Sequence, residues 1–222
     1  MIKALIFDFD YTLTDRSASI YYGLSRIADK HFKDLDWMEK EAVVQRMITL
    51  DEFGSVSRQH TIDYMVEHYN LDREELTKDF STLSMDMAPK TVLDKDALPL
   101  LEELKKNYDY KLAILTNGNT ESQLYKIDVT HIHEFFDYIA VSEESGYWKP
   151  DKRAFEYIAN KLDVKCEECL YIGDTFFTDI IGAYRAKMQF LLLNNDRKRT
   201  YDARIPQIEH LSEVIDYLKD HE

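Results

Sequence analysis

Cysteine, proline and glycine are scarce in this sequence. It contains two cysteines, four prolines and six glycines among 222 residues, whereas 45% of the residues are hydrophobic and 13% are aromatic. This composition excludes small disulfide scaffolds, fibrous chains and disordered chains. A chain of this length buries about 70% of its unfolded surface, either as one large domain or as a core with a smaller insert.

The two cysteines, Cys166 and Cys169, form a single CxxC motif. Such motifs occur in redox sites and as halves of zinc sites. Here no second CxxC exists, and the histidines His131 and His133 lie far away in the sequence. The motif also precedes a predicted strand, whereas a reactive pair opens a helix. We therefore interpret both cysteines as structural.

Long apolar runs and positive charge are also lacking. The longest apolar runs, such as residues 4–7 and 190–193, are far shorter than the roughly 20 residues of a transmembrane helix. The 28 Lys and Arg against 42 Asp and Glu give a net charge of −14, which disfavours binding to a nucleic-acid polymer or an anionic membrane. Because Asp8 interrupts the first apolar stretch, we expect neither a signal nor a transit peptide, and hence a cytoplasmic protein.

Short apolar runs that end abruptly in polar residues are present instead. This pattern is typical of buried parallel strands, and helical stretches separate the runs from about residue 91 onward. The fold class expected is α/β, with a doubly wound, Rossmann-like parallel sheet covered by helices on both faces. The predicted strands are residues 5–7, 112–115, 138–141, 170–172 and 190–193.

Residues 15–90 show helical periodicity without a convincing strand. Asp36 with Glu39, and Asp72 with Glu75, have the spacing of a helix N-cap followed by an acid in the first turn. A helical block that begins after the first strand and ends before the second is an insertion. We therefore predict a core of residues 1–14 and 91–222 and a helical cap of residues 15–90.

Asp8 and Asp10 follow the first predicted strand. Residues two apart on an extended chain point to the same side, so both carboxylates face one pocket. Because the two groups repel each other, they need a cation, a shared proton or divided roles, and Mg²⁺ is a common solution. The alternative is that both are solvated caps of an ordinary turn.

The other strand ends carry complementary groups. Thr116 and Asn117 offer a hydroxyl and backbone N–H groups for a phosphoryl oxygen, and Lys149 offers a compact positive charge. Asp174 and Asp179 add two acids after the strand at 170–172. In a doubly wound sheet, functional groups collect at the carboxyl ends of strands. Together these residues provide a nucleophile, an acid, an anion clamp and a metal ligand.

This set of motifs resembles the haloacid dehalogenase superfamily, in its phosphatase branch with a helical cap inserted after the first motif. The resemblance covers essentially the whole chain. Segments 116–118, 142–146 and 149–150 are most similar to those of the nucleotidase and acylneuraminate-phosphate phosphatase group. The four motifs are Asp8-x-Asp10-x-Thr12-Leu13, Thr116, Lys149-Pro150, and Gly173-Asp174 with Asp179.

The resemblance implies a Mg²⁺-dependent phosphatase in which Asp8 attacks phosphorus and forms an aspartyl-phosphate. Asp10 would act as general acid and then as general base. Asp8, Asp10 through its backbone carbonyl, and Asp174 would bind the metal. The implied phosphate-binding residues are Thr116, Asn117 and Lys149, with Asp179 orienting Lys149 or a metal-bound water.

Two positions depart from the family pattern. Tyr11 stands where many relatives have a small residue, usually Gly, and Lys187 stands where a helix-ending Gly is common. In the cap, segment 53–58 is the candidate for substrate contact, with Gly54 permitting a tight turn and Arg58 reaching a polar or anionic group. The alternative is that Arg58 is a surface residue. Tyrosines of the cap are candidates for stacking on a base or sugar, or for cap core: Tyr21, Tyr22, Tyr64 and Tyr69.

Other readings remain open at this point. A dehalogenase of the same fold displaces halide, which leaves without protonation, so Asp10 argues for the phosphatase. A receiver-type signalling module has no use for the helical insert, and a binding protein without activity would not need every catalytic position filled. Nucleoside monophosphates and sugar phosphates are candidate substrates among small phosphorylated metabolites. The sequence leaves open a monomer or a homodimer.

Overall fold

The computed structural model describes residues 1–54, 56–195 and 199–221, the side chain of Phe53 excepted. The chain divides into two compact units. The core unit comprises Met1–Asp15 and Leu93–Glu222, and the cap unit comprises Arg16–Val92. The predicted division after residues 14 and 90 lies close to these boundaries. Each unit is described separately below.

The core unit contains a six-stranded sheet in the order β5-β4-β1-β6-β7-β8, in which every assigned pair is parallel. The predicted doubly wound parallel sheet is confirmed. β8 and a second, two-stranded sheet of β2 and β3 were not predicted, because two-residue strands are too short to show a pattern. The strands are β1 (Ala4–Phe7), β2 (Thr14–Asp15), β3 (Val92–Leu93), β4 (Lys111–Thr116), β5 (Tyr138–Val141), β6 (Cys169–Gly173), β7 (Gln189–Leu193) and β8 (Gln207–Ile208).

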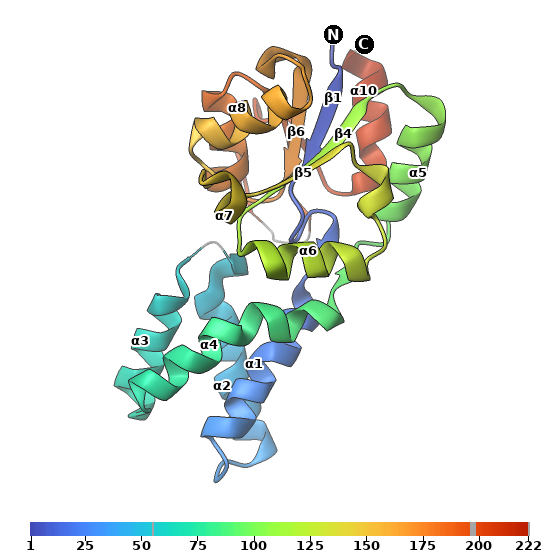
Figure 1. The fold of residues 1–222 in the computed structure, drawn as a ribbon. Helices are drawn as coiled ribbons and strands as arrows, with labels where there is room; N and C mark the ends of the chain where they lie inside the picture. Colours follow the sequence, from blue (N-terminus) through green and yellow to red (C-terminus); the bar gives the residue numbers. More distant parts are fainter. Residues whose placement is uncertain (55, 196–198, 222) are drawn as a thin grey trace. The chain divides into compact units, whose positions relative to one another are not determined.

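Helices of the core unit cover both faces of this sheet (Figure 1). Leu5 and Phe7 of β1 pack on the face covered by α5 and α10, whereas Ala4 and Ile6 pack on the face covered by α8 and α9. This alternation follows from the two-residue period of a strand, and burial on both faces explains the continuous apolar runs. The helices are α5 (Ala97–Asn107), α6 (Thr120–Val129), α7 (Ser142–Ser145), α8 (Lys152–Lys161), α9 (Ile181–Arg185) and α10 (Val214–His221).

Five short helical segments also belong to this unit or border it. The π-helix η5 leads into α9, and η4 leads into β6. The segments are η2 (Ala88–Lys90), η3 (His133–Phe135), η4 (Cys166–Glu168), η5 (Phe176–Ile180) and η6 (Leu211–Glu213).

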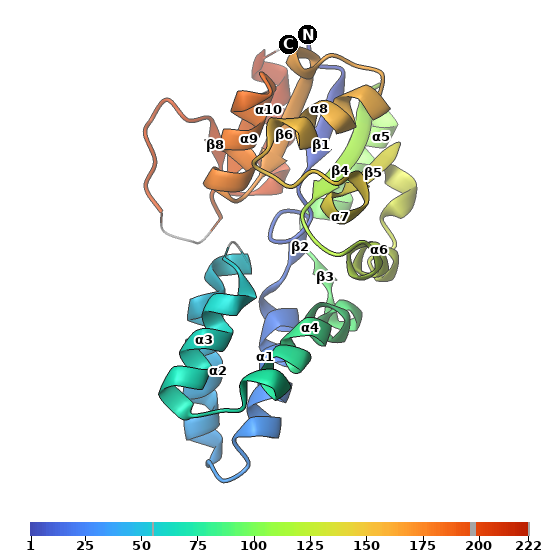
Figure 2. The same ribbon diagram turned by 60° about the vertical axis from the view of Figure 1, so that its left-hand side comes forward.

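The cap unit is helical, and its four α-helices lie beside one another (Figure 2). Its buried residues include Ile20, Leu24, Val44, Met47 and Met65, which carried the predicted periodicity. The helices are α1 (Ser17–His31), α2 (Trp37–Asp51), η1 (Glu52–Gly54), α3 (Arg58–Tyr69) and α4 (Arg73–Met87).

Both predicted helix starts in the cap unit are confirmed. The Asp36 side chain accepts hydrogen bonds from the backbone of Met38 and Glu39, and the Glu39 side chain accepts one from the Asp36 backbone. The Asp72 side chain accepts a hydrogen bond from the Glu75 backbone. These contacts satisfy amide groups that have no partner inside the helix.

Three of the four cap tyrosines lie at the cap surface, whereas Tyr64 is partly buried and packs against the cap core. Tyr21, Tyr22 and Tyr69 are between 37% and 42% exposed. The Tyr21 hydroxyl donates to Glu41, 2.7 Å away, and Tyr64 stacks on the His68 ring. The expectation of a place in the cap core was wrong for Tyr21, Tyr22 and Tyr69, because the apolar positions of the four helices already fill that core, whereas Tyr64 packs against it.

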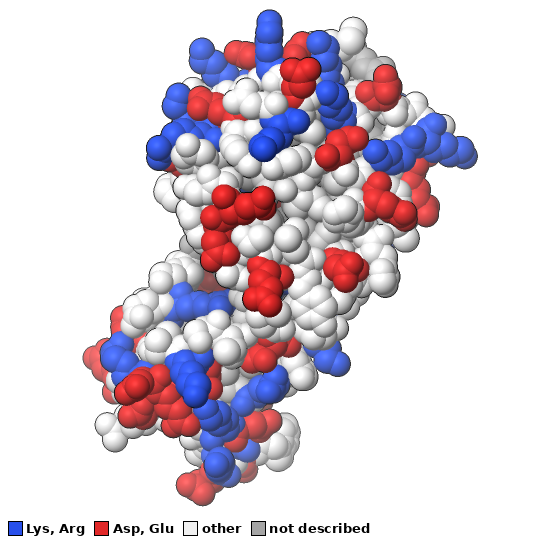
Figure 3. Space-filling model, viewed as in Figure 1, with Lys and Arg blue, Asp and Glu red and all other residues white. Residues whose placement is uncertain are grey.

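Charged side chains of both signs are interspersed on the face shown in Figure 3.

Within the described part of the chain, no helix combines the length and apolar character needed to cross a membrane.

Gly182 lets α9 approach α8 closely. A Cβ atom at this position would lie 2.2 Å from Cε2 of the buried Phe155 ring. We expect Gly182→Ala to lower the free energy of unfolding by about 2 kcal/mol through overpacking, as measured by urea denaturation. Phe155→Leu should relieve the clash, so the double variant should be more stable than the sum of the two single effects predicts. Strictly additive effects would contradict this explanation.

Candidate functional site

The candidate site lies where β1, β4 and β6 end. Asp8 directly follows β1, and its backbone N–H donates to the Ile172 carbonyl, 2.9 Å away, so the chain is still aligned with β6 at this residue. Thr116 is the last residue of β4, and Asp174 follows the last residue of β6. Because the strands are parallel, these residues meet at one edge of the sheet although they are far apart in the sequence.

Lys149 is the centre of the site. Its Nζ atom lies 2.8 Å from Oδ1 of Asp8, 2.7 Å from Oδ1 of Asp179 and 3.0 Å from the Tyr171 hydroxyl. The Tyr171 hydroxyl is 3.1 Å from the Leu115 carbonyl, to which it donates. The lysine side chain is only 2% exposed, so its charge is compensated by these neighbours and not by water.

Asp179 is fully buried and held from two sides. Its second oxygen accepts a hydrogen bond from the Thr175 backbone, 2.9 Å away. A Cβ atom at Gly173 would lie 2.6 Å from the Asp179 carboxylate. The glycine at the end of β6 therefore makes room for the carboxylate that holds Lys149.

Asn117 fixes the backbone of Lys149. Its side-chain nitrogen donates to the Lys149 carbonyl at 3.0 Å, and its oxygen accepts from the Lys149 N–H at 2.9 Å. This pair of bonds joins the end of β4 to the loop before α8. The Asn117 side chain thus positions Lys149, and the phosphate contact expected from its backbone stays a prediction.

Three buried carboxylates cluster at this site, and two of them, Asp8 and Asp179, contact the Lys149 ammonium group. Ligand atoms of Asp8, Asp174 and Asp179 lie within 4.8 Å of one another. Asp174 accepts hydrogen bonds from the Thr12 hydroxyl at 3.3 Å and the Thr175 hydroxyl at 3.1 Å. An excess of buried negative charge with oxygen donors suits a hard divalent cation, and the residues present therefore fit such an ion.

The pKa values in the site reflect this charge balance. Burial, together with repulsion by Asp179 and Asp174, raises the pKa of Asp8 to about 8, although Lys149 acts in the opposite direction. Burial alone would lower the pKa of Lys149, but the Asp179 and Asp8 carboxylates outweigh it and raise that pKa. Burial and the same two carboxylates raise the pKa of the Tyr171 phenol well above its usual value. Tyr171 is therefore a neutral hydrogen-bond donor.

Asp10 contacts two residues of α6. Lys126 Nζ lies 2.7 Å from Oδ1 and 2.5 Å from Oδ2 of Asp10, and Gln123 Nε2 donates to Oδ2 at 3.2 Å. Gln123 Nε2 also donates to the Thr116 hydroxyl oxygen at 2.6 Å. Gln123 and Lys126 were not predicted as residues of this site. Their spacing of three places them on one helix face, but in the sequence they look like ordinary surface positions.

The candidate substrate residues of the cap are engaged within the cap unit. Arg58 donates from Nη1 to the Phe80 carbonyl at 3.0 Å and from Nη2 to the Ser84 hydroxyl at 2.6 Å. Gly54 has a φ of 78°, and a Cβ atom there would lie 2.9 Å from Nη1 of Arg16. The tight turn expected at Gly54 is present. A substrate contact by Arg58 stays a prediction, and Ser55 of the same segment lies outside the described residues.

The two departures from the family pattern both have left-handed backbone. Tyr11 has a φ of 60° and Lys187 a φ of 62°. Glycine adopts this conformation without strain, which agrees with the glycine that the resemblance implies at both places.

The CxxC motif shows no feature of a reactive site. Cys169 is the first residue of β6 and is fully buried, and Cys166 is partly buried. Burial raises the pKa of the Cys169 thiol to about 12. Neither cysteine belongs to a metal-type cluster found among the described residues.

A second cluster of possible metal ligands lies in the cap unit, at His31, Glu75 and Asp79. The Lys30 ammonium group lies 2.7 Å from both Asp79 oxygens and 3.1 Å from Glu75. A lysine therefore already supplies the positive charge, and the cluster is an ion-pair network.

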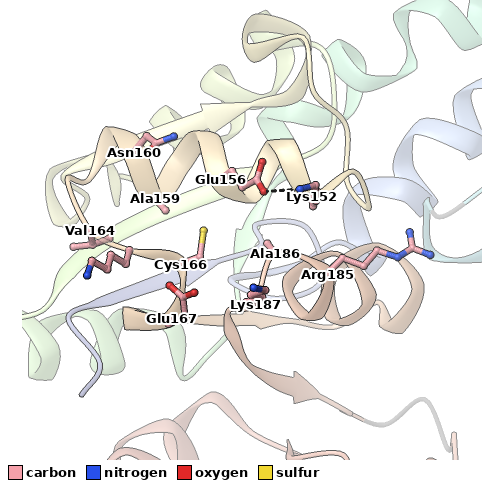
Figure 4. A pocket seen from close by; sticks show the side chains of 11 residues that line it. Lys152, Glu156, Ala159, Asn160, Val164, Cys166, Glu167, Arg185, Ala186 and Lys187 are labelled. Atoms are coloured by element: carbon pink, nitrogen blue, oxygen red, sulfur yellow. Dashed lines mark hydrogen bonds and ion pairs between the residues drawn. The ribbon is translucent and has the colours of Figure 1, made fainter.

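A surface cavity of about 530 Å³ lies elsewhere in the core unit (Figure 4). It is lined by residues of α8 and η4, by Arg185 at the end of α9, and by Ala186 and Lys187. The η4 residues precede the amino end of β6, and residues 185–187 precede that of β7. The catalytic candidates lie at the carboxyl ends of the strands, so this cavity is not the site described above.

Comparisons with known proteins agree with this geometry. The family model for haloacid dehalogenase-like hydrolases matches residues 2–187. A glyceraldehyde 3-phosphate phosphatase from Methanopyrus kandleri is 27% identical over 99% of this chain and 98% of its own length. An N-acylneuraminate-9-phosphatase from Rattus norvegicus is 28% identical over 85% of this chain and 80% of its own length.

Among solved structures, the HAD-hydrolase YfnB from Bacillus subtilis bound to magnesium is similar in fold. It has a TM-score of 0.76 and 24% identity, and the similarity covers 98% of each chain. Sequence, fold and family model therefore agree: the chain belongs to the haloacid dehalogenase-like hydrolase family.

Proposed function

We propose that the protein is a Mg²⁺-dependent phosphatase that hydrolyses a small phosphomonoester metabolite through an aspartyl-phosphate. The observation that carries the proposal is the Asp8 carboxylate, buried at a strand end and 2.8 Å from Lys149, with Asp10 two residues away. Relatives of this chain are named as phosphatases of small phosphorylated metabolites, which supports the same class of reaction.

Asp8 is the proposed nucleophile. Its oxygen attacks phosphorus in line with the ester oxygen and forms a covalent phosphoenzyme, so that one difficult hydrolysis becomes two easier steps. Lys149 compensates negative charge beside this oxygen, and Asp179 and Asn117 hold Lys149 in place. Asp8, Asp174 and the Asp10 backbone carbonyl would hold Mg²⁺, which supplies positive charge against the dianionic ester when bound.

Thr116, the Asn117 backbone and Lys149 are proposed to stabilise the negative charge on the other oxygens of the phosphoryl group. Each well-placed donor to an equatorial oxygen lowers the activation free energy by roughly a few kcal/mol. Thr116 is buried, and its hydroxyl oxygen already accepts a hydrogen bond from Gln123. Its own proton is therefore directed away from Gln123.

Asp10 is the proposed general acid and base. It gives a proton to the departing oxygen in the first step and takes one from water in the second. A dehalogenase needs no such residue, because halide leaves without a proton.

The cytoplasmic location and a monomeric or homodimeric state stay expectations.

Hydrolysis of 4-nitrophenyl phosphate tests the reaction. We expect activity with Mg²⁺, loss of activity with a chelator and recovery when Mg²⁺ is added back. Asp8→Asn should lower kcat by at least about 1,000-fold, because the nucleophile is removed. The matched control is Asp109→Asn, which changes an exposed acid and should behave as wild type. Activity that survives the chelator or the loss of Asp8 would contradict the mechanism.

Stability without metal gives a test that does not depend on activity. The pKa of Asp8 is about 8 in the folded protein and about 3.9 when unfolded, so this group lowers stability progressively as the pH rises from 4 to 8. Asp8→Asn should therefore raise the free energy of unfolding of the metal-free protein at pH 8, by about 1 to 3 kcal/mol, and by less at pH 5.

Urea denaturation at the two pH values measures this difference. Mg²⁺ at 100 times its dissociation constant should stabilise the wild type by about 2.7 kcal/mol and the Asn variant by less. Equal stabilisation of both proteins by Mg²⁺ would place the cation elsewhere.

A substrate panel tests the class of leaving group. We expect the highest kcat/KM among phosphomonoesters of small metabolites: glyceraldehyde 3-phosphate, nucleoside monophosphates, phosphoglycolate and acylneuraminate phosphate. Phosphodiesters should not react, because their phosphorus carries a second ester group. Preference for a diester or a haloacid in this panel would exclude the proposed reaction.

A further inference from the structure

Lys126 of α6 is a buried lysine on a helix. Its side chain is 7% exposed, and its ammonium group contacts both oxygens of Asp10 at 2.7 and 2.5 Å. It also lies 5.6 Å from the centre of the Phe9 ring. Burying a charge at a helix surface is costly unless a partner requires it there, and here the partner is the proposed general acid and base.

Gln123 contacts the same carboxyl group from the same helix. It is 2% exposed, and its amide nitrogen lies 3.2 Å from Oδ2 of Asp10, 2.6 Å from the Thr116 hydroxyl and 3.3 Å from the Asn117 carbonyl. One amide group therefore touches both the residue that transfers protons and the residue that holds the phosphoryl group.

The start of α6 is itself fixed. Asn119 caps the helix by accepting from the Ser122 N–H, and its side-chain nitrogen donates to Glu143 at 2.9 Å. The Thr120 N–H donates to the same carboxylate at 2.8 Å. Because Gln123 and Lys126 lie one turn apart on this anchored helix, both donors keep a defined position relative to the sheet.

We propose that Lys126 is a positioning residue that orients the Asp10 carboxyl group for proton transfer, with Gln123 coupling this orientation to Thr116. The inference rests on the phosphatase function proposed above. A lysine that only filled space would not need its charge directed at both carboxyl oxygens.

Both chemical steps need this orientation. In the first, an Asp8 oxygen bonds to phosphorus, the ester P–O bond breaks, and the Asp10 proton moves to the departing oxygen. In the second, a water oxygen bonds to phosphorus, the bond between phosphorus and Asp8 breaks, and Asp10 takes the water proton. Lys126 touches none of the reacting atoms and acts through Asp10.

The dependence on the leaving group tests the proposal. The kcat/KM value reports the steps up to ester cleavage, for which phenolate needs a proton and 2,4-dinitrophenolate does not. Lys126→Met should lower kcat/KM for phenyl phosphate about 100-fold and for 2,4-dinitrophenyl phosphate less than about 5-fold. A purely structural defect would lower both values by the same factor.

The second step gives an independent measurement. With 2,4-dinitrophenyl phosphate, slow proton removal from water should make phosphoenzyme hydrolysis limiting in Lys126→Met. Rapid mixing should then show a burst of dinitrophenolate approaching one equivalent per enzyme, larger than that of the wild type.

Lys126→Arg should recover part of the phenyl phosphate activity, because arginine can also donate to both carboxyl oxygens. The matched control is Lys161→Met, since the Lys161 ammonium faces the Tyr138 and Tyr157 rings at 5.3 and 5.2 Å. If Lys126→Met does not fold, Lys126→Gln replaces it in the comparison of kcat/KM for phenyl phosphate and 2,4-dinitrophenyl phosphate.

Equal losses for the two esters, or no loss, would overturn the role of Lys126. A wild-type protein that hydrolyses neither ester would instead overturn the phosphatase function itself.

Discussion

The contact between the Lys149 ammonium group and the carboxylates of Asp8 and Asp179 is the interaction on which the site depends. All three side chains are buried, and the lysine and the acids each offset the cost of burying the other's charge. Several features of the fold serve this contact: the glycine at the end of β6, the phenol of Tyr171 and the amide of Asn117. One ammonium against three carboxylates leaves negative charge in excess, which a bound cation would offset.

Much of the fold was predictable because burial on both faces leaves a clear pattern in the sequence. The runs at 5–7, 112–115 and 170–172 all became central strands, and the caps at Asp36 and Asp72 marked real helix starts. β8 could not be predicted in this way. Its two residues, Gln207 and Ile208, are too few to show a period, and the β7 pairing that defines them is a long-range property.

The site was predictable where a residue stands directly at a strand end. Asp8, Thr116 and Asp174 follow from the rule that parallel strands bring their carboxyl ends together. Gln123 and Lys126 were not predicted, because they contact Asp10 from a helix whose sequence looks like an ordinary surface helix. The partner of a lysine side chain depends on which neighbour its helix faces, and tertiary packing decides this. The structural role of the Asn117 side chain was hidden for the same reason.

The described contacts among Asp8, Asp10, Thr116, Lys149, Asp174 and Asp179 all come from one unit of the chain. The residues proposed for the chemistry of the phosphoryl group thus lie outside the segment 16–92. A substitution in that segment therefore replaces none of these six side chains. Such a division allows the cap sequence to change while the proposed reaction residues stay the same, and the relatives at 27% and 28% identity carry names of different phosphorylated substrates.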